Sequence, residues 1–288
     1  MIATRRVDYG GGKLLGGEWL NGFAVVGVNS FILISGYFRI QFKWKKLFFI
    51  FYSIAFVCGV DYLLHISGAS LFNFDYAWHT IVPFHAKANW FIPAYIGLML
   101  LSPLLNGGLE HLGAKKWSRL ILLLTLLNFY AYFTNISSLN PNGYSLVHFI
   151  YLYVLGAWMK VLPSFRPLLC ILFYVFAALF TGLVAVKIHS GFTAYAYNSP
   201  QVLLSSAALF LFFKEIHLKK SWINRLAAST FTVFLFHYII LYHVKALGHF
   251  QDLPLLQLGL IYLLVFFASY LLHELIAYTY HFFDFWKK

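Results

Sequence analysis

Nine long apolar segments divide the chain, and they restrict its possible folds more than any other feature. A helix that crosses the hydrocarbon core of a bilayer needs about 20 mostly apolar residues, because it must satisfy its own backbone hydrogen bonds. Charged residues make up only 10% of the 288 residues, against about 25% in a soluble domain, and the mean hydropathy is +0.75. The sequence predicts an all-α polytopic membrane bundle of about nine transmembrane helices, at residues 22–40, 47–66, 90–108, 117–135, 145–162, 168–188, 201–217, 226–247 and 255–283.

The distribution of Lys and Arg predicts the orientation of these spans. Cytoplasmic connections of membrane proteins are enriched in both residues. One set of alternate connections holds 15 of them and the other set holds 6. The richer set includes Lys287 and Lys288, so we expect the C-terminus in the cytoplasm. Nine spans then place an N-terminal tail, residues 1–21, on the outer side, and residues 22–288 form one transmembrane domain.

The formal net charge of +12 does not indicate a nucleic-acid partner, because the basic residues lie in short clusters between apolar segments. Membrane lipids are the expected surroundings. The twelve histidines form no HExxH pattern, and the two cysteines, Cys58 and Cys170, lie inside apolar stretches. We therefore expect neither a metal site nor a disulfide framework.

Polar and small residues interrupt the first apolar segment, whose sequence from Gly27 to Phe38 is GVNSFILISGYF. One interpretation is close helix packing at the small residues, with hydroxyl groups bonded back to the preceding turn. The other is a chemical site, in which Gly36 allows close backbone approach and Ser35 and Tyr37 offer hydroxyl donors. The segment alone leaves both interpretations open.

Four stretches, taken in order, resemble the membrane acyltransferase 3 family, whose members O-acylate cell-surface polysaccharides, lipid-linked sugars and related acceptors. NSFILISGYF is similar to the family's second-helix motif, which is followed by basic residues. The other three stretches are NWFIPAYIGLMLLSPLLN from Asn89, FIYLYVLGAWMK from Phe149 and LAASTFTVFLFH from Leu226. Each motif is weak alone, and their order along nearly the whole chain carries the resemblance.

The resemblance implies a function and a cellular location. We expect an O-acyltransferase that moves an acyl group, acetyl in the first instance, from acyl-CoA to a hydroxyl of a cell-surface polysaccharide or lipid-linked sugar. It implies acyl-CoA as co-substrate without a bound cofactor, a glycan or glycolipid acceptor, and the bacterial cytoplasmic membrane. Family members have ten helices, and the first carries the presumed catalytic His. This sequence shows no such helix, which leaves three explanations open: an upstream start, a truncated gene and an inactive copy. As given, the chain is expected to be inactive, because no residue can be assigned the family's His.

The same resemblance suggests residues for each role. Ser35, Tyr37 and His237 are the catalytic candidates, with the family's histidine unassigned. Gly36, Lys43, Lys45 and Lys46 are expected at the acyl-CoA site, and His79, His85, Asn89 and Trp90 at the acceptor site. The competing interpretations are membrane anchoring for the lysines, interface polarity for His79 and His85, and a hydrogen-bonded core position for His237.

Two other functions fit a polytopic chain of this composition. The first is a permease or lipid-linked sugar flippase, and the second is a catalytically inactive partner in an envelope complex. Transporters commonly contain repeated halves. The sequence shows no internal repeat, which favours the enzyme.

Overall fold

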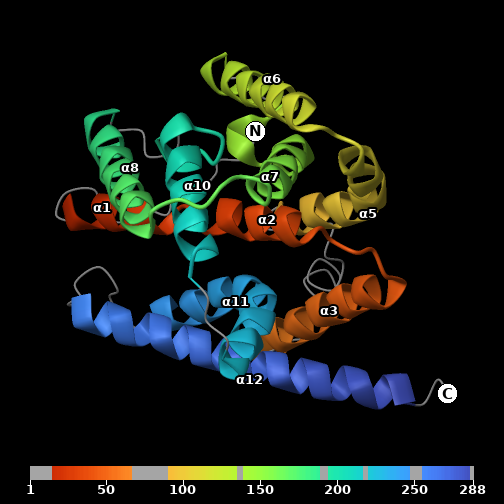
Figure 1. Ribbon diagram of the computed structural model, residues 1–288. Coiled ribbons are helices and arrows are strands. Elements are labelled where there is room, and N and C mark those ends of the chain that lie inside the picture. The colour runs from red at the N-terminus through yellow and green to blue at the C-terminus, as the bar shows by residue number, and fades with distance from the viewer. Residues whose placement is uncertain are drawn as a thin grey trace. The chain divides into compact units, whose positions relative to one another are not determined.

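A computed structural model describes residues 15–66, 90–134, 139–188, 194–216, 220–246 and 255–285 (Figure 1). All regular structure in these ranges is helical, which confirms the predicted all-α class. The elements are α1 (Leu15–Ala24), α2 (Gly27–Phe38), α3 (Trp44–Ile66), α5 (Phe91–Glu110), α6 (Ala114–Phe133), η1 (Pro141–Gly143), α7 (Leu146–Met159), α8 (Pro167–Ile188), α10 (Pro200–Lys214), α11 (Ser221–Ala246) and α12 (Leu255–Phe285).

Five stretches of the described residues are long and apolar enough to cross a membrane. They are Trp19–Phe38, Trp44–Leu63, Phe91–Glu110, Pro167–Lys187 and Gly259–His281. Helices α7 and α10 are apolar but shorter, and the 14 residues of α7 span only about 21 Å. Each of the nine predicted segments coincides with helix, but the number of nine spans stays a prediction. The exposed apolar face of α8 suits contact with lipid; it consists of Leu168, Leu169, Leu172, Phe173, Phe176, Leu179, Phe180 and Leu183.

The first predicted span is divided in the structure. Helix α1 begins at Leu15, within the predicted tail, and ends at Ala24, and α2 begins at Gly27. Glycine has a low helix propensity, and Gly27 has open space around it, so no packing contact requires this residue. The break itself consists of Val25 and Val26, which are β-branched and, like Gly27, have a lower helix propensity than alanine or leucine.

The described helices form two compact units (Figure 1). One contains α3, α11 and α12, in which α11 packs along α12 and both contact α3. The other contains α1, α2, α5, α6, η1, α7, α8 and α10. In this second unit α7 packs against α2, α5 and α6, and its Phe149, Leu152 and Tyr153 are fully buried. Helix α7 is therefore the centre of the second unit.

Two glycines allow α2 and α7 to cross closely. A Cβ on Gly36 would lie against the carbonyl of Tyr153 and 2.9 Å from its Cα, and a Cβ on Gly156 would lie against the carbonyl of Leu33 and 3.0 Å from its Cα. In both cases the obstacle is the backbone of the partner helix. Small residues of this kind are how membrane helices approach each other. The packing interpretation therefore accounts for Gly36.

Candidate functional site

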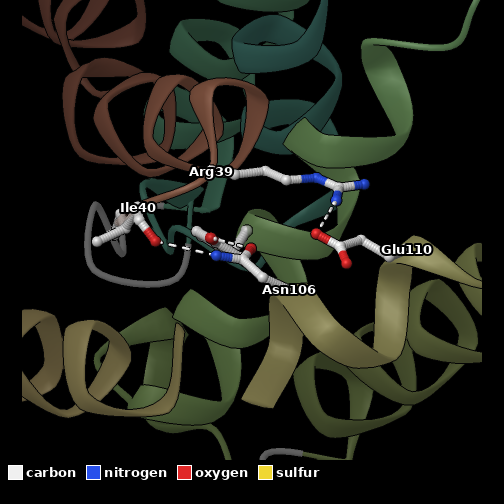
Figure 2. A network of polar contacts seen from close by, with 5 residues as sticks. Arg39, Ile40, Asn106 and Glu110 are labelled. Atoms are coloured by element: carbon white, nitrogen blue, oxygen red, sulfur yellow. Dashed lines mark hydrogen bonds and ion pairs between the residues drawn. The ribbon is translucent and has the colours of Figure 1, made fainter. Parts of the chain in front are cut away.

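The chain leaves α2 through a turn that is unusual for its residue type. Arg39 has φ 53° and ψ 103°, and its amide donates to the carbonyl of Gly36 at 3.1 Å. Positive φ is uncommon for a residue with a side chain. Asn106 of α5 fixes the turn, because its Nδ2 donates to the carbonyl of Ile40 at 3.0 Å (Figure 2). Asn106 is in turn fixed by Tyr153, whose hydroxyl donates to its Oδ1 at 2.7 Å.

The turn directs the Arg39 side chain toward the end of α5, as Figure 2 shows. One guanidinium nitrogen lies 3.8 Å from a carboxylate oxygen of Glu110, and the side chains are 25% and 61% exposed. The pair is long and its carboxylate is exposed, although the arginine is only partly so, and its contribution is about 1 kcal/mol or less. The guanidinium is thus held near water by a weak partner, which an anionic ligand can replace.

A second cation lies at the same end of α2. Nζ of Lys160 lies 5.9 Å from the centre of the Tyr37 ring, which also packs against Phe210 with ring centres 5.4 Å apart. Two residues earlier in the helix, the hydroxyl of Ser35 donates to the carbonyl of Phe31 at 2.9 Å, on another face of α2. Of the predicted residues, the structure therefore brings Tyr37 beside Lys160, and the amide of Arg39 binds the carbonyl of Gly36.

The sequence predicted no site role for Arg39, Asn106, Glu110, Tyr153 or Lys160. Arg39 and Lys160 were counted only among the 15 basic residues of the connections that are predicted to be cytoplasmic. Two signals were available: Arg39 is the first residue after the stretch NSFILISGYF, and Asn106 is the last residue of the stretch NWFIPAYIGLMLLSPLLN, both of which were compared with the family.

The other predicted residues of the donor site belong to the unit of α3, α11 and α12. Lys43, Lys45 and Lys46 are exposed at the start of α3, and the carbonyl of Lys45 accepts from the hydroxyl of Tyr280 at 3.2 Å. His237 lies in α11, with its Nδ1 2.7 Å from the carbonyl of Phe234. This nitrogen must carry the proton, because a carbonyl only accepts. Only Nε2 of His237 remains as a basic nitrogen.

The predicted acceptor residues His79, His85 and Asn89 lie outside the described residues. Trp90 is described and precedes α5. Its ring lies 4.5 Å from that of Tyr144, 5.7 Å from that of Tyr197 and 5.6 Å from that of Phe149, measured between centres. Burial raises the pKa of the Tyr144 and Tyr197 hydroxyls above the usual value, so both stay protonated donors. We call the half-buried rings of Trp90, Tyr144 and Tyr197 the aromatic cluster.

Within the described ranges, no group of three or more His, Cys, Asp or Glu side chains is placed to hold a metal ion. The end of α2 and the aromatic cluster offer cations, hydroxyls and amides. These groups suit binding of anions and sugars.

Comparison with known proteins identifies the family. The profile of the acyltransferase 3 family, described as an acyltransferase domain, matches residues 5–274. No curated protein and no solved structure matches the chain. Because the match extends over most of the sequence, the chain belongs to the acyltransferase 3 family and is a multi-pass membrane acyltransferase.

Proposed function

We propose that this acyltransferase moves an acyl group, acetyl in the first instance, from acyl-CoA to a hydroxyl of a cell-surface polysaccharide or lipid-linked sugar in the bacterial cytoplasmic membrane. The reaction needs cations for the phosphates of the carrier, donors for the developing oxyanion and a group that takes the hydroxyl proton. Candidates for the first two requirements lie at the end of α2.

The observation that carries the proposal is the fixed turn at Arg39. A non-glycine residue at positive φ persists only where its surroundings hold it, and such positions are common at ligand sites. Asn106 and Tyr153 hold this one, and the result is a guanidinium with a weak, exposed partner. Arg39 and Lys160 both lie on the side that the Lys and Arg distribution predicts to be cytoplasmic, where acyl-CoA is found. A polyphosphate carrier suits this pair of cations.

Helix α5 separates the two candidate regions. Trp90 precedes its first residue, and Asn106 and Glu110 lie near its last. Twenty helical residues rise about 30 Å at most, because Pro103 interrupts the hydrogen bonding of α5 and can bend it. The aromatic cluster at the opposite end of α5 combines apolar faces with polar tips, which suits a sugar acceptor. The donor and the acceptor would then approach from opposite sides of the membrane.

Inside-out membrane vesicles test this proposal, with the protein produced in an active form that also carries the family's first helix and its presumed catalytic His. We expect label from acetyl-CoA to enter a glycan or glycolipid fraction. Changing Lys45 and Lys46 together to Gln should raise the apparent KM for acyl-CoA roughly 2- to 30-fold, because an exposed ion pair contributes about 0.2–1 kcal/mol.

Lys115 and Lys116 provide the matched control for that experiment. They are exposed at the start of α6, in another connection that is predicted to be cytoplasmic. Changing both to Gln should leave the KM unchanged. Equal KM values for the two double variants would return Lys45 and Lys46 to membrane anchoring, and absence of label from every acceptor fraction would contradict the proposed reaction.

The orientation is tested separately. The count of 15 against 6 basic residues predicts that a reporter fused after Lys288 is cytoplasmic. A reporter such as alkaline phosphatase should then be inactive, and green fluorescent protein at the same position should be fluorescent. The opposite pattern would place the Arg39 turn on the side without acyl-CoA, and the proposed donor site would be wrong.

A further inference from the structure

A histidine lies between two asparagines in the interior of the second unit. His148, in the first turn of α7, is completely buried. Its Nδ1 lies 3.1 Å from Oδ1 of Asn128 in α6, and its Nε2 lies 3.1 Å from Oδ1 of Asn29 in α2. Both ring nitrogens therefore face amide oxygens.

The backbone of residues 197 and 198 sets the orientation of these amides. Nδ2 of Asn29 donates to the carbonyl of Tyr197 at 2.9 Å, and Nδ2 of Asn128 donates to the carbonyl of Asn198 at 3.0 Å. Because each amide nitrogen is used in this way, each amide presents its oxygen to His148. An amide oxygen can only accept a hydrogen bond.

The number of protons on the ring decides whether this arrangement is satisfied. A neutral imidazole has one N–H donor and one bare nitrogen, so one of the two 3.1 Å contacts with His148 would join two lone pairs. A protonated imidazole donates on both sides. A neutral ring is satisfied only if one amide turns over. Turning Asn29 leaves the carbonyl of Tyr197 without its donor, whereas turning Asn128 leaves that of Asn198 without its donor and also breaks the 3.1 Å hydrogen bond from Nδ2 of Asn140. The hydrogen bonds that fix residues 197 and 198 therefore depend on whether the His148 ring carries one proton or two.

Residues 197 and 198 adjoin the aromatic cluster. The ring of Tyr197 belongs to that cluster, and its amide donates to the carbonyl of Asn142 at 3.0 Å. Nδ2 of Asn198 donates to the carbonyl of Asn140 at 3.2 Å. Oδ1 of Asn198 and the hydroxyl of Ser199 are buried without a hydrogen-bond partner among the described residues. The two asparagine amides are therefore a substantial part of what fixes this segment.

Other titratable groups around His148 do not change charge near neutral pH. Helix α7 contributes Tyr151, whose ring centre lies 6.2 Å from that of His148, and the adjoining segments contribute Tyr144 and Tyr197. Burial raises the pKa of Tyr144 and Tyr197. Helices α2 and α6 contribute Asn29 and Asn128. No charged side chain in the described part of the chain contacts the ring.

We propose that His148 is a positioning residue for acyl transfer, and that its protonation fixes residues 197 and 198 beside the aromatic cluster. Complete burial without a counter-ion lowers the pKa of His148, and the two amide oxygens, which accept only from an N–H, oppose this shift. An unperturbed histidine changes charge at about pH 6.5, so the change at His148 is expected below that value. The expected effect of His148 on acceptor binding rests on the proposed function. Its expected effect on the position of residues 197 and 198 does not.

Hydrogen exchange of the peptide 194–199 tests the segment directly. In His148→Gln the side chain stays neutral at every pH and offers one donor and one acceptor, as a neutral ring does. The ratio of the exchange rate in the variant to that in the wild type cancels the intrinsic pH dependence. We expect a ratio of several-fold at about pH 5 that falls toward one at about pH 8, while His281→Gln, at an exposed histidine, gives a ratio of one throughout. A ratio for His148→Gln that does not change with pH would overturn the proposal.

Asn29→Ala repeats the test with the histidine in place. This change removes the oxygen that faces Nε2 and, at every pH, the donor to Tyr197. The ratio should therefore exceed one throughout and should be larger at about pH 5 than at about pH 8. If His148→Gln does not fold, the exchange ratio of Asn29→Ala to the wild type replaces it as the test. A ratio that does not change with pH contradicts the proposal.

Acyl transfer supplies a readout that a purely structural histidine would not change. The acceptor KM of the wild type should rise several-fold from about pH 5 to about pH 8, whereas that of His148→Gln should stay constant. The KM for acyl-CoA should lack this dependence in both proteins. A wild-type acceptor KM that is independent of pH would contradict the positioning role. Absence of transfer would count against the proposed function alone, because the exchange experiment judges the segment independently.

Discussion

Replacing Gly36 by alanine or leucine is expected to abolish acyl transfer and to reduce the amount of folded protein in the membrane. A Cβ at this position would lie 2.9 Å from the Cα of Tyr153 and against its carbonyl. Because these are backbone atoms, no side-chain rotation can accommodate the added carbon, and α2 and α7 must separate. Overpacking of an interior costs about 1–3 kcal/mol and occasionally more, and a backbone obstacle places this change at the upper end.

Two further glycines make the experiment specific. Gly156→Ala introduces the same obstacle from the opposite helix and should have the same effect. Gly27→Ala lies in the same helix as Gly36, but nothing lies within 4 Å of the added carbon, so it should retain both folding and transfer. Thermal stability and monodispersity in detergent report the folded state. Normal folding of Gly36→Ala with complete loss of transfer would restore the interpretation of Gly36 as part of the acyl-CoA site.

The contrast between the two interpretations of Gly36 shows what the sequence can and cannot predict. Apolar length and the polar breaks predicted a helix at each of the nine segments, because both depend on local composition. The meeting of Gly36 with Tyr153 depends on which helices pack together, and these residues are far apart in the chain. The motif drew attention to the glycine, whereas its contact with Tyr153 is known only from the structure.

The buried asparagines illustrate the same limit at the site. Asn29, Asn128 and His148 each stand as isolated polar residues within apolar segments, and none has a spacing that indicates a partner. Each also requires hydrogen bonds in the interior, since a buried polar group without them is costly. Polar residues of this kind in three apolar segments indicate that the three helices pack together. The sequence does not predict which ring nitrogen of His148 faces which amide oxygen. That detail is what links a proton on His148 to Tyr197 and Asn198.

The second large effect is expected at Arg39, where one substitution can remove the charge of the side chain and still preserve the backbone turn. Arg39→Gly should retain the turn, because glycine adopts φ 53° without strain, while it removes the guanidinium. A hydrogen bond to a charged group contributes about 1.5–3 kcal/mol, and about 1.4 kcal/mol corresponds to a tenfold change in affinity. The apparent KM for acyl-CoA should therefore rise roughly 10- to 150-fold, with the acceptor KM unchanged.

Variants on either side of the ion pair complete this test. Arg39→Lys retains the charge but loses the planar donor geometry, so its KM should lie between those of the wild type and Arg39→Gly. Glu110→Gln removes the carboxylate 3.8 Å from the guanidinium, which competes with a phosphate for the same cation. Its KM for acyl-CoA should be equal to or below that of the wild type, and its stability should be unchanged, because the pair is long and exposed. If instead Arg39→Gly and Glu110→Gln weaken transfer equally through kcat, then the ion pair itself is what the enzyme needs, and Arg39 does not bind the carrier.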